Sequence, residues 1–390
     1  MQLLNKMDGT RNDLGRLRVV VTVFFFIDGF IFASWAVRIP AVRQQVAASP
    51  ALLGLALLGA SAGAVATMAI TGRLCRRFGS RRVTTVAAVW LSLALLLPPL
   101  ARSAVWLGLG LVVFGIGYGG LNVAMNSVAV DLVAAARRPI MPSFHAAWSF
   151  GGLAGSAAGG LLAPHLAPFG HLALVTVLGL IVTAAGGRVL LRHPVPPAPE
   201  DTEPSPGRPG KTWRVVALFG LIALCGAYGE GAIADWGALH LQQDLGAGAG
   251  LAAAGYSAFA VAEACGRLFG GRLLARFGQT PVLVAGGLTA CAGMLAAALA
   301  PFLALALAGF ALTGLGVANL FPAAMTRAGL LAGPNGVAAA STLGYGGFLL
   351  GPPAIGFLAS SVSLGTGLTT VSFLALIAAG LGYLARPRAV

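Results

Sequence analysis

Long apolar stretches recur along the whole chain. Each is about 20 residues or longer, which is the length of helix that crosses a hydrocarbon core roughly 30 Å thick. None shows the strict alternation of an outer-membrane barrel strand, so each is predicted to be helical. The sequence therefore predicts an all-α integral membrane protein with twelve transmembrane helices, near residues 18–38, 50–72, 82–101, 104–132, 142–164, 168–190, 213–238, 250–272, 279–299, 302–331, 336–360 and 364–385.

The composition excludes the common soluble classes. Only 9% of the residues are charged and 57% are hydrophobic, whereas a soluble domain has roughly 25% charged residues. So few charges cannot cover the surface of a water-soluble protein of this length. A cytosolic enzyme, a secreted disulfide scaffold and a disordered chain are all excluded.

The basic residues indicate how the chain crosses the membrane. Arg38, Arg43 and Arg102 fall on one side and Arg267 lies within a predicted helix, while the other 21 of the 25 Lys and Arg residues fall on the side of the N-terminus. Cytoplasmic loops carry an excess of Lys and Arg, so both termini are predicted to be cytoplasmic. The net charge of +14 is then explained by contact with anionic membrane lipids, without nucleic acid. The expected location is the bacterial plasma (inner) membrane.

A proline-rich stretch divides the chain into two similar halves. Residues 191–212 hold seven of the 22 prolines and are predicted to be a cytoplasmic linker between six-helix bundles at 1–190 and 213–390. GRLCRRFGSRRV at 72–83 parallels GRLLARFGQTPV at 271–282, and GIGYGGLNVAM at 115–125 parallels GLGVANLFPAAM at 314–325. Repeats of six helices enter the membrane from the same side, so a pseudo-two-fold axis along the membrane normal is expected, with a central site between the bundles.

The loop after the second apolar stretch carries a motif of glycine and arginine, formed by Gly72, Arg76, Arg77, Gly79, Arg81 and Arg82. It resembles Gly-x-x-x-Asp-Arg-x-Gly-x-Arg-Arg of the major facilitator superfamily, and the resemblance covers the whole chain. The family's Asp helps to latch the cytoplasmic gate, but Arg76 stands in its place here. The resemblance thus implies gating roles for Arg76 and Arg77, with Asp131 as a substitute counter-charge.

Two further resemblances point to different substrates. Residues 122–152 look like the fucose-permease-like and YbjJ-like branch, although the acid that sugar permeases carry in their fourth helix is Asn122 here. Gly151, Gly155 and Gly159-Gly160 are similar to the antiporter signature Gly-x-x-x-Gly-Pro-x-x-Gly-Gly, with Ser156 in place of Pro. The same glycines could simply let helices pack closely.

Asp28 is the leading candidate for carrying a proton. It lies ten residues from either end of its predicted helix, about 15 Å from each surface at the rise of an α-helix, with no basic residue within one turn. Burial favours the neutral form of such a carboxyl group, so it could load a proton on one side and release it on the other. The alternative is a structural acid that hydrogen-bonds a neighbouring helix.

Other charged residues occur in the second half. Glu230 matches the place of Asp28 and is assigned either proton or substrate coupling or a gating role. Glu263 and Arg267 are four residues apart, so they share a helix face and can neutralise each other. Alternatively, Arg267 binds an anionic substrate or modulates a proton on Glu263. His145 near a cytoplasmic helix end is a gate candidate or a structural histidine.

The candidates for substrate contact are polar or aromatic side chains within the predicted helices. Amides bind hydroxyl groups but also join helices, and aromatic rings offer an apolar face. Besides Arg267, this set comprises Trp35, Tyr118, Asn122, Asn126, Trp148, Tyr228, Asn319 and Tyr345.

The sequence therefore predicts a secondary active transporter that works by alternating access, coupled to protons, with a small sugar-like substrate favoured. The alternative is a proton-driven efflux antiporter for drugs or lipophilic metabolites. Sodium coupling is disfavoured because it needs several convergent oxygen ligands. No catalytic residues, cofactor or metal are expected, since the chain lacks HExxH, paired membrane aspartates and a P-loop. The expected partners are the substrate, protons and lipids, around a monomer.

Overall fold

The computed structural model describes residues 2–48, 50–163, 165–193, 195 and 209–386. Every regular element within them is a helix. In the first half these are α1 (Gln2–Ala36), α2 (Ile39–Gln45), α3 (Pro50–Phe78), α4 (Ser80–Ala94), η1 (Pro98–Leu100), α5 (Ala104–Ala136), α6 (Met141–Leu162) and α7 (Pro168–Arg192). In the second half they are α8 (Pro209–Ala232), the π-helical η3 (Ile233–Gly237), α9 (Ala238–Gln243), α10 (Ala249–Phe277), α11 (Gln279–Ala298), α12 (Leu303–Val317), α13 (Leu320–Ser361) and α14 (Leu364–Leu384).

The described helices account for the predicted membrane spans. Nine segments are long and apolar enough to cross a membrane, and one of them, Leu303–Ala359, is 57 residues long. At 1.5 Å per residue this segment is far longer than one crossing, and it contains two predicted spans. The remaining two predicted spans coincide with α6 and α10, which have 22 and 29 residues. The chain is thus an all-α membrane protein with twelve transmembrane helices.

One boundary differs from the sequence prediction. A helix ending near 331 and a new one starting near 336 were expected. Instead, the chain breaks at Ala318 and Asn319, and α13 continues over 42 residues. Gly333 takes a positive φ of 55°, which glycine adopts without steric cost, so the local distortion does not end the helix.

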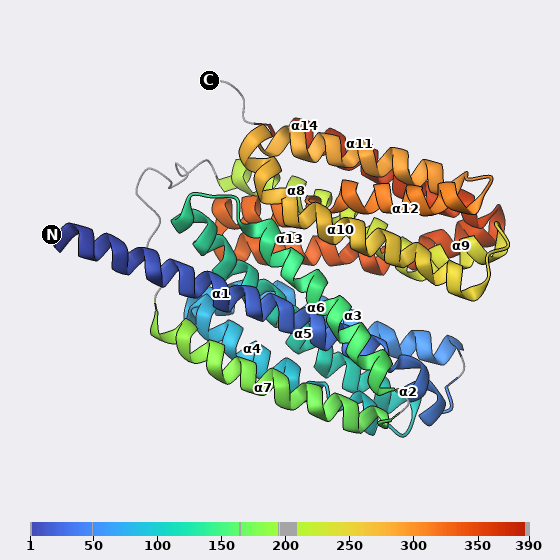
Figure 1. Ribbon diagram of the computed structural model, residues 1–390, viewed down its shortest axis with the longest axis horizontal. Coiled ribbons are helices and arrows are strands. Elements are labelled where there is room, and N and C mark those ends of the chain that lie inside the picture. The colour runs from blue at the N-terminus through green and yellow to red at the C-terminus, as the bar shows by residue number, and fades with distance from the viewer. Residues whose placement is uncertain (1, 49, 164, 194, 196–208, 387–390) are drawn as a thin grey trace. The chain divides into compact units, whose positions relative to one another are not determined.

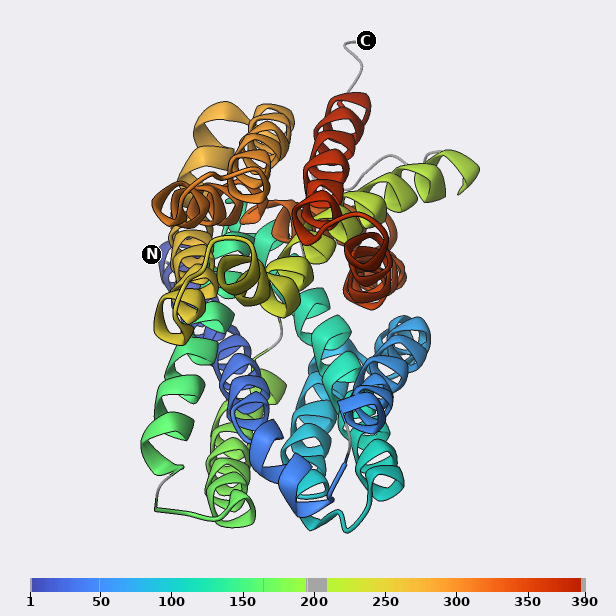
Figure 2. The same cartoon turned by 90° about the vertical axis from the view of Figure 1, so that its right-hand side faces the viewer.

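The helices form two compact units. One contains Met1–Arg137, Ala147–Ser205 and Gly333–Ala338, and the other contains Arg138–Ala146, Pro206–Ala332 and Ala339–Val390. In the first unit α3 and α4 pack on α5, and α1 and α4 pack on α7 (Figures 1 and 2). In the second, α11 packs on α12 and α14, α10 packs on α12, and α8 packs on α14. Most of the predicted linker, at 194 and 196–208, lies outside the described residues.

Small residues bring several helix backbones into contact. Gly151 and Gly155 of α6 face the carbonyl groups of Phe26 and Phe30 in α1, with no room for a Cβ atom. Gly63 of α3 meets Val112 of α5 in the same way. The predicted close contacts through the glycines of the fifth span are therefore confirmed.

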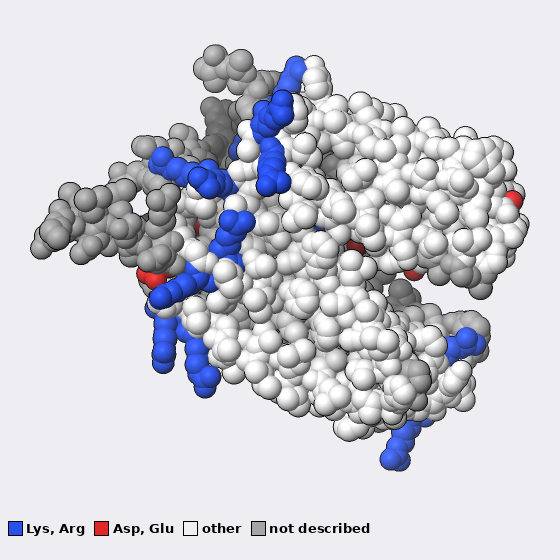
Figure 3. All heavy atoms as spheres, in the orientation of Figure 1, with Lys and Arg blue, Asp and Glu red and all other residues white. Residues whose placement is uncertain are grey.

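The outer flanks of the helices are apolar, as a lipid-facing surface requires. Large hydrophobic side chains are widely exposed, such as Leu161 at 75% and Val105 at 72%. Figure 3 shows white helix flanks, with Lys and Arg gathered towards helix ends. The charges therefore lie where headgroups and water can solvate them.

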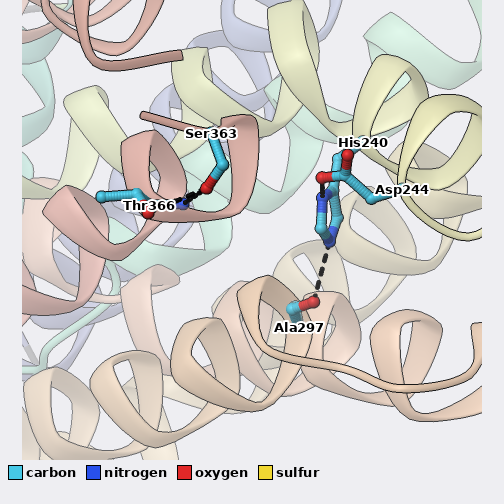
Figure 4. A network of polar contacts seen from close by, with 5 residues as sticks. All are labelled: His240, Asp244, Ala297, Ser363 and Thr366. Atoms are coloured by element: carbon cyan, nitrogen blue, oxygen red, sulfur yellow. Dashed lines mark hydrogen bonds and ion pairs between the residues drawn. The ribbon is translucent and has the colours of Figure 1, made fainter. Parts of the chain in front are cut away.

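A polar network fixes helix ends in the second unit (Figure 4). The buried His240 ring of α9 places Nδ1 2.7 Å from Asp244 Oδ2 and Nε2 3.0 Å from the Ala297 carbonyl oxygen at the end of α11. Ser363 caps α14 by accepting a hydrogen bond of 3.1 Å from the Thr366 backbone N–H. These contacts satisfy polar groups at helix ends that would otherwise be costly to bury.

Candidate transport site

Asp28 lies in the interior of the first unit. Its side chain is fully buried, eight residues before α1 ends at Ala36. The Trp148 Nε1–H of α6 donates a hydrogen bond of 3.0 Å to Oδ2, whereas Oδ1 has no hydrogen-bond partner among the described residues. No ion pair joins Asp28 to a described basic side chain. The carboxyl group thus has one fixed donor and one oxygen available to a proton.

The approach of α6 to α1 explains this contact. Gly29, next to Asp28, faces the Trp148 carbonyl group so closely that no Cβ would fit. The backbone of Trp148 is therefore in contact with α1. From this position its indole N–H can reach the Asp28 carboxylate. The position of Asp28 was predictable, but its donor was not, because the two residues are 120 positions apart.

Aromatic rings line up beside this pair. The Phe32 ring lies 5.3 Å from that of Tyr118 and 6.3 Å from that of Trp148, centroid to centroid, and Phe114 stacks on Tyr118 at 6.3 Å. The structure thus joins the predicted residues Tyr118 and Trp148 through Phe32, which the sequence did not single out. Trp35 is buried on the same helix, but the structure gives it no hydrogen bond with Asp28.

The two asparagines of α5 are buried in the first unit. Asn122 is 6% exposed and Asn126 is 0% exposed, and the Asn126 Nδ2–H donates to the Asn122 carbonyl oxygen at 2.8 Å. This i,i+4 contact satisfies one amide proton locally. Their place inside the unit is compatible with either of the predicted roles, substrate contact or helix packing.

Arg267 anchors a charge cluster in the second unit. Its Nη2 lies 2.6 Å from Glu263 Oε1 and 3.5 Å from Glu230 Oε2, and its Nε donates to the Ala318 carbonyl oxygen at 3.4 Å. The predicted Glu263–Arg267 pair is present, and Glu230 of α8 joins it.

Polar and aromatic residues surround this cluster. Asn319, at the break between α12 and α13, donates from Nδ2 to the Gly266 carbonyl oxygen at 3.1 Å. His145 is buried and meets the Phe321 ring edge-on at 5.7 Å, with Tyr345 on the other side of Phe321 at 6.4 Å. Tyr228 instead hydrogen-bonds Thr370 of α14 at 2.8 Å.

The basic motif between α3 and α4 makes specific contacts within the first unit. With its amide oriented to suit its neighbours, Asn335 accepts a hydrogen bond of 3.1 Å from Arg76 Nε and donates one of 3.3 Å to the Gly72 carbonyl oxygen. Arg81 donates to the carbonyl oxygens of Leu190 and His193 and interacts electrostatically with Asp131. Arg77 lies over the neighbouring Phe78 ring. Asn335 was not predicted, since nothing in the sequence links it to Gly72.

The described residues contain no group of three His, Cys, Asp or Glu side chains that could hold a metal ion.

The chain is similar to known transporters over nearly its whole length. The family model described as Major Facilitator Superfamily matches residues 20–233 and 219–390. An uncharacterized MFS-type transporter of Yersinia pestis is 34% identical over 368 residues, which cover 93% of this chain and 94% of that protein.

Solved structures share the fold. The fucose:proton symporter FucP of E. coli superposes with a TM-score of 0.78 at 16% identity, covering 95% of this chain and 98% of that one. The proton:xylose symporter XylE superposes with a TM-score of 0.78 at 15% identity, covering 95% of both chains. At this level of identity the likeness concerns the fold alone.

Proposed function

The chain belongs to the major facilitator superfamily, and from this premise we propose that it moves a small, sugar-like molecule together with protons by alternating access. It is a multi-pass membrane transporter and not an enzyme. Asp28 carries the proposal, because it is a fully buried carboxyl group with one fixed donor and one oxygen without a described partner.

Asp28 is proposed to bind and release the coupled proton. An ionised carboxylate in a membrane interior is costly, so the protonated form is favoured whenever the residue is shielded from water. The Trp148 N–H stabilises the carboxylate once the proton has left. Exposure to opposite sides of the membrane in turn would let the same group load and unload.

The cluster of Glu230, Glu263 and Arg267 is proposed as a second proton-binding group. With both carboxylates ionised it carries a net charge of −1, and a single proton makes it neutral. The contacts of Arg267 Nη2 with both carboxyl groups, at 2.6 Å from Glu263 Oε1 and 3.5 Å from Glu230 Oε2, support treating the three side chains as one group. This assigns Arg267 to balancing charge in preference to binding an anionic substrate.

A sugar-like substrate is supported by polar and aromatic residues of the first unit. Asn122 and Asn126 supply amide groups that can bind hydroxyls, and Phe32, Tyr118 and Trp148 offer aromatic faces. A few placed polar groups within an apolar and aromatic lining are typical of small-molecule sites. Two solved proteins with the same fold are a fucose:proton symporter and a proton:xylose symporter, which is consistent with this class.

Two experiments on the purified protein test the proposal. The first is a thermal-shift panel in detergent, with L-fucose, D-xylose and other small polyols against hydrophobic cations such as tetraphenylphosphonium. We expect stabilisation by at least one hydroxylated compound. Stabilisation by hydrophobic cations and by no sugar would favour the efflux antiporter instead.

The second experiment measures uptake of the stabilising sugar into proteoliposomes with an inward proton gradient. Asp28→Asn keeps an oxygen for the Trp148 N–H but binds no proton, so gradient-driven accumulation should fall to the level of protein-free vesicles. Asp235→Asn, at an exposed carboxylate of η3, is the matched control and should accumulate the sugar normally. Unchanged accumulation by Asp28→Asn would show that Asp28 is not the carrier.

A further inference from the structure

Arg38 is a buried arginine at the end of the first membrane helix. It follows α1, immediately before α2, and only 3% of its surface is exposed. Among the described residues no carboxylate forms an ion pair with it, whereas the buried Arg267 has two. Burial lowers the pKa of the Arg38 guanidinium, but a group this basic keeps its charge. The structure therefore buries a positive charge without a described counter-charge.

The neighbouring histidine adds a second donor to this region. The Arg38 Nε–H donates a hydrogen bond of 2.9 Å to His171 Nδ1 at the start of α7. A ring nitrogen that accepts carries no proton, so the imidazole is neutral and its proton is on Nε2. His171 is fully buried, and neither its Nε2 nor Arg38 Nη2 has a hydrogen-bond partner among the described residues.

A third unpaired polar group lies one helical turn before Arg38. Ser34 of α1 is fully buried, and its hydroxyl also lacks a described partner. Ser34 lies in the last turn of α1, which ends at Ala36, and Arg38 follows in the turn before α2. All three unpaired groups can donate a hydrogen bond. The guanidinium Nη2 and the protonated imidazole Nε2 cannot accept one, so their partner must be an acceptor.

The surrounding helices limit the size of any ligand. Gly159 of α6 packs against this region, and a Cβ atom there would lie 3.3 Å from His171 Cε1 and 3.2 Å from Val37 Cγ1. Ser34, Arg38 and His171 are all nearly or fully buried. A lipid headgroup or a sugar would need exposure that these side chains do not have.

We propose that Arg38, His171 and Ser34 form a binding site for a small inorganic monoanion of about the size of chloride. A buried positive charge without a described carboxylate partner, with a buried N–H donor on the adjoining His171 and a buried O–H donor on Ser34, is complementary to such an ion, because charge-assisted hydrogen bonds are strongest where water is scarce. The bound anion would neutralise the guanidinium at the contact of α1, α6 and α7. The site is distinct from Asp28 and does not depend on the transported substrate.

Thermal unfolding of the full-length protein in detergent tests this site. Sodium gluconate is replaced stepwise by sodium chloride or bromide at constant ionic strength. A ligand that binds only the folded state raises the unfolding temperature, so we expect a saturable rise of about 3–5 °C with either halide. Labelled chloride should bind saturably to the same protein.

Variants locate the effect. Arg38→Gln should abolish the halide-dependent rise and the chloride binding, while Arg102→Gln, which removes an exposed positive charge, should preserve both. His171→Phe retains a ring against Gly159 but removes the Nε2–H donor. If Arg38→Gln does not fold, the halide effect is compared between the wild type and His171→Phe instead. The proposal is overturned if the wild type unfolds at the same temperature in gluconate and chloride, or if the halide effect survives in the variant that folds.

Discussion

The two oxygens of Asp28 have different surroundings, and this difference defines the residue's chemistry. Trp148 fixes Oδ2 through a single N–H, while Oδ1 has no described partner. A carboxylate held by several donors would resist protonation, and one with none would stay protonated. A single donor leaves the two forms close enough in free energy for a proton to be exchanged during transport.

Trp148→Phe tests this balance. The phenyl ring preserves the contact with Phe32 but removes the only described donor to the carboxylate. Without it the protonated form persists to higher pH, so the pH at which sugar uptake is half-maximal should rise by about one unit, since a hydrogen bond to a charged group contributes about 1.5 kcal/mol.

The control is Trp106→Phe, which changes an indole of α5 that is 65% exposed. Its pH profile should match that of the wild type. If Trp148→Phe also superimposes on the wild type, the indole N–H has no part in setting the proton affinity of Asp28.

Several site residues could be identified from the sequence by the cost of burying them. Asp28, Glu263 and Arg267 stand out because charges are rare within apolar helices, and the Glu263–Arg267 spacing fixes their pairing on one helix. Partners on other helices could not be assigned, since neither Trp148 for Asp28 nor Glu230 for Arg267 follows from any local spacing. Ser34, Arg38 and His171 were not predicted as a site, because no sequence spacing links His171 to the other two residues. Only the fold shows that each has a buried donor without a described partner.

At the scale of helices, glycine spacing determines how closely backbones approach. Gly151 and Gly155 lie against α1, whereas a Cβ atom added at Gly160 of the same helix would meet nothing within 4 Å. Van der Waals contact between backbones is a main stabilising term for membrane helices, which gain little from the hydrophobic effect. The α1–α6 contact also places Trp148 beside Asp28, so packing and proton chemistry are connected.

Gly155→Ala and Gly160→Ala separate packing from helix propensity. A Cβ at Gly155 would lie 2.5 Å from the Phe30 carbonyl oxygen, so the helices must move apart at a cost of about 1–3 kcal/mol. At Gly160 the same change meets nothing and should be neutral or stabilising by up to about 1 kcal/mol. Thermal unfolding in detergent should show a lower midpoint for Gly155→Ala alone, and equal midpoints would contradict close packing at Gly155.

Helix boundaries were the weakest part of the sequence prediction. Hydropathy located most spans to within a few residues, because the length of an apolar run is set by the bilayer. It misplaced the break between α12 and α13, since a Gly-Pro-Asn-Gly sequence has the composition of a turn whether or not the chain stops there. At the actual break, Asn319 donates a hydrogen bond to the Gly266 carbonyl oxygen of α10, and hydropathy does not report such contacts between helices.

Across the whole molecule, charge is separated from the apolar surface. The described helix flanks are nearly free of Lys and Arg, which gather towards helix ends (Figure 3). Loops rich in Lys and Arg remain on the cytoplasmic side during insertion, so their distribution determines orientation. The helix ends that adjoin Gly79, between α3 and α4, carry Arg77, Arg81 and Arg82, whereas the loop before α5 contains Arg102 alone. The α3–α4 junction and the loop before α5 are therefore expected on opposite sides of the membrane.

Truncated fusions to alkaline phosphatase test this orientation in bacterial cells, because that enzyme is active only outside the cytoplasm. A fusion after Ser103 should be active, and a fusion after Gly79 should show only background activity. Green fluorescent protein, which fluoresces when it folds in the cytoplasm, gives the reciprocal readout and should be bright only after Gly79. The reverse pattern would contradict the predicted orientation, because the basic loops would then lie outside the cytoplasm. In that orientation the proton gradient proposed to drive uptake through Asp28 would drive export instead.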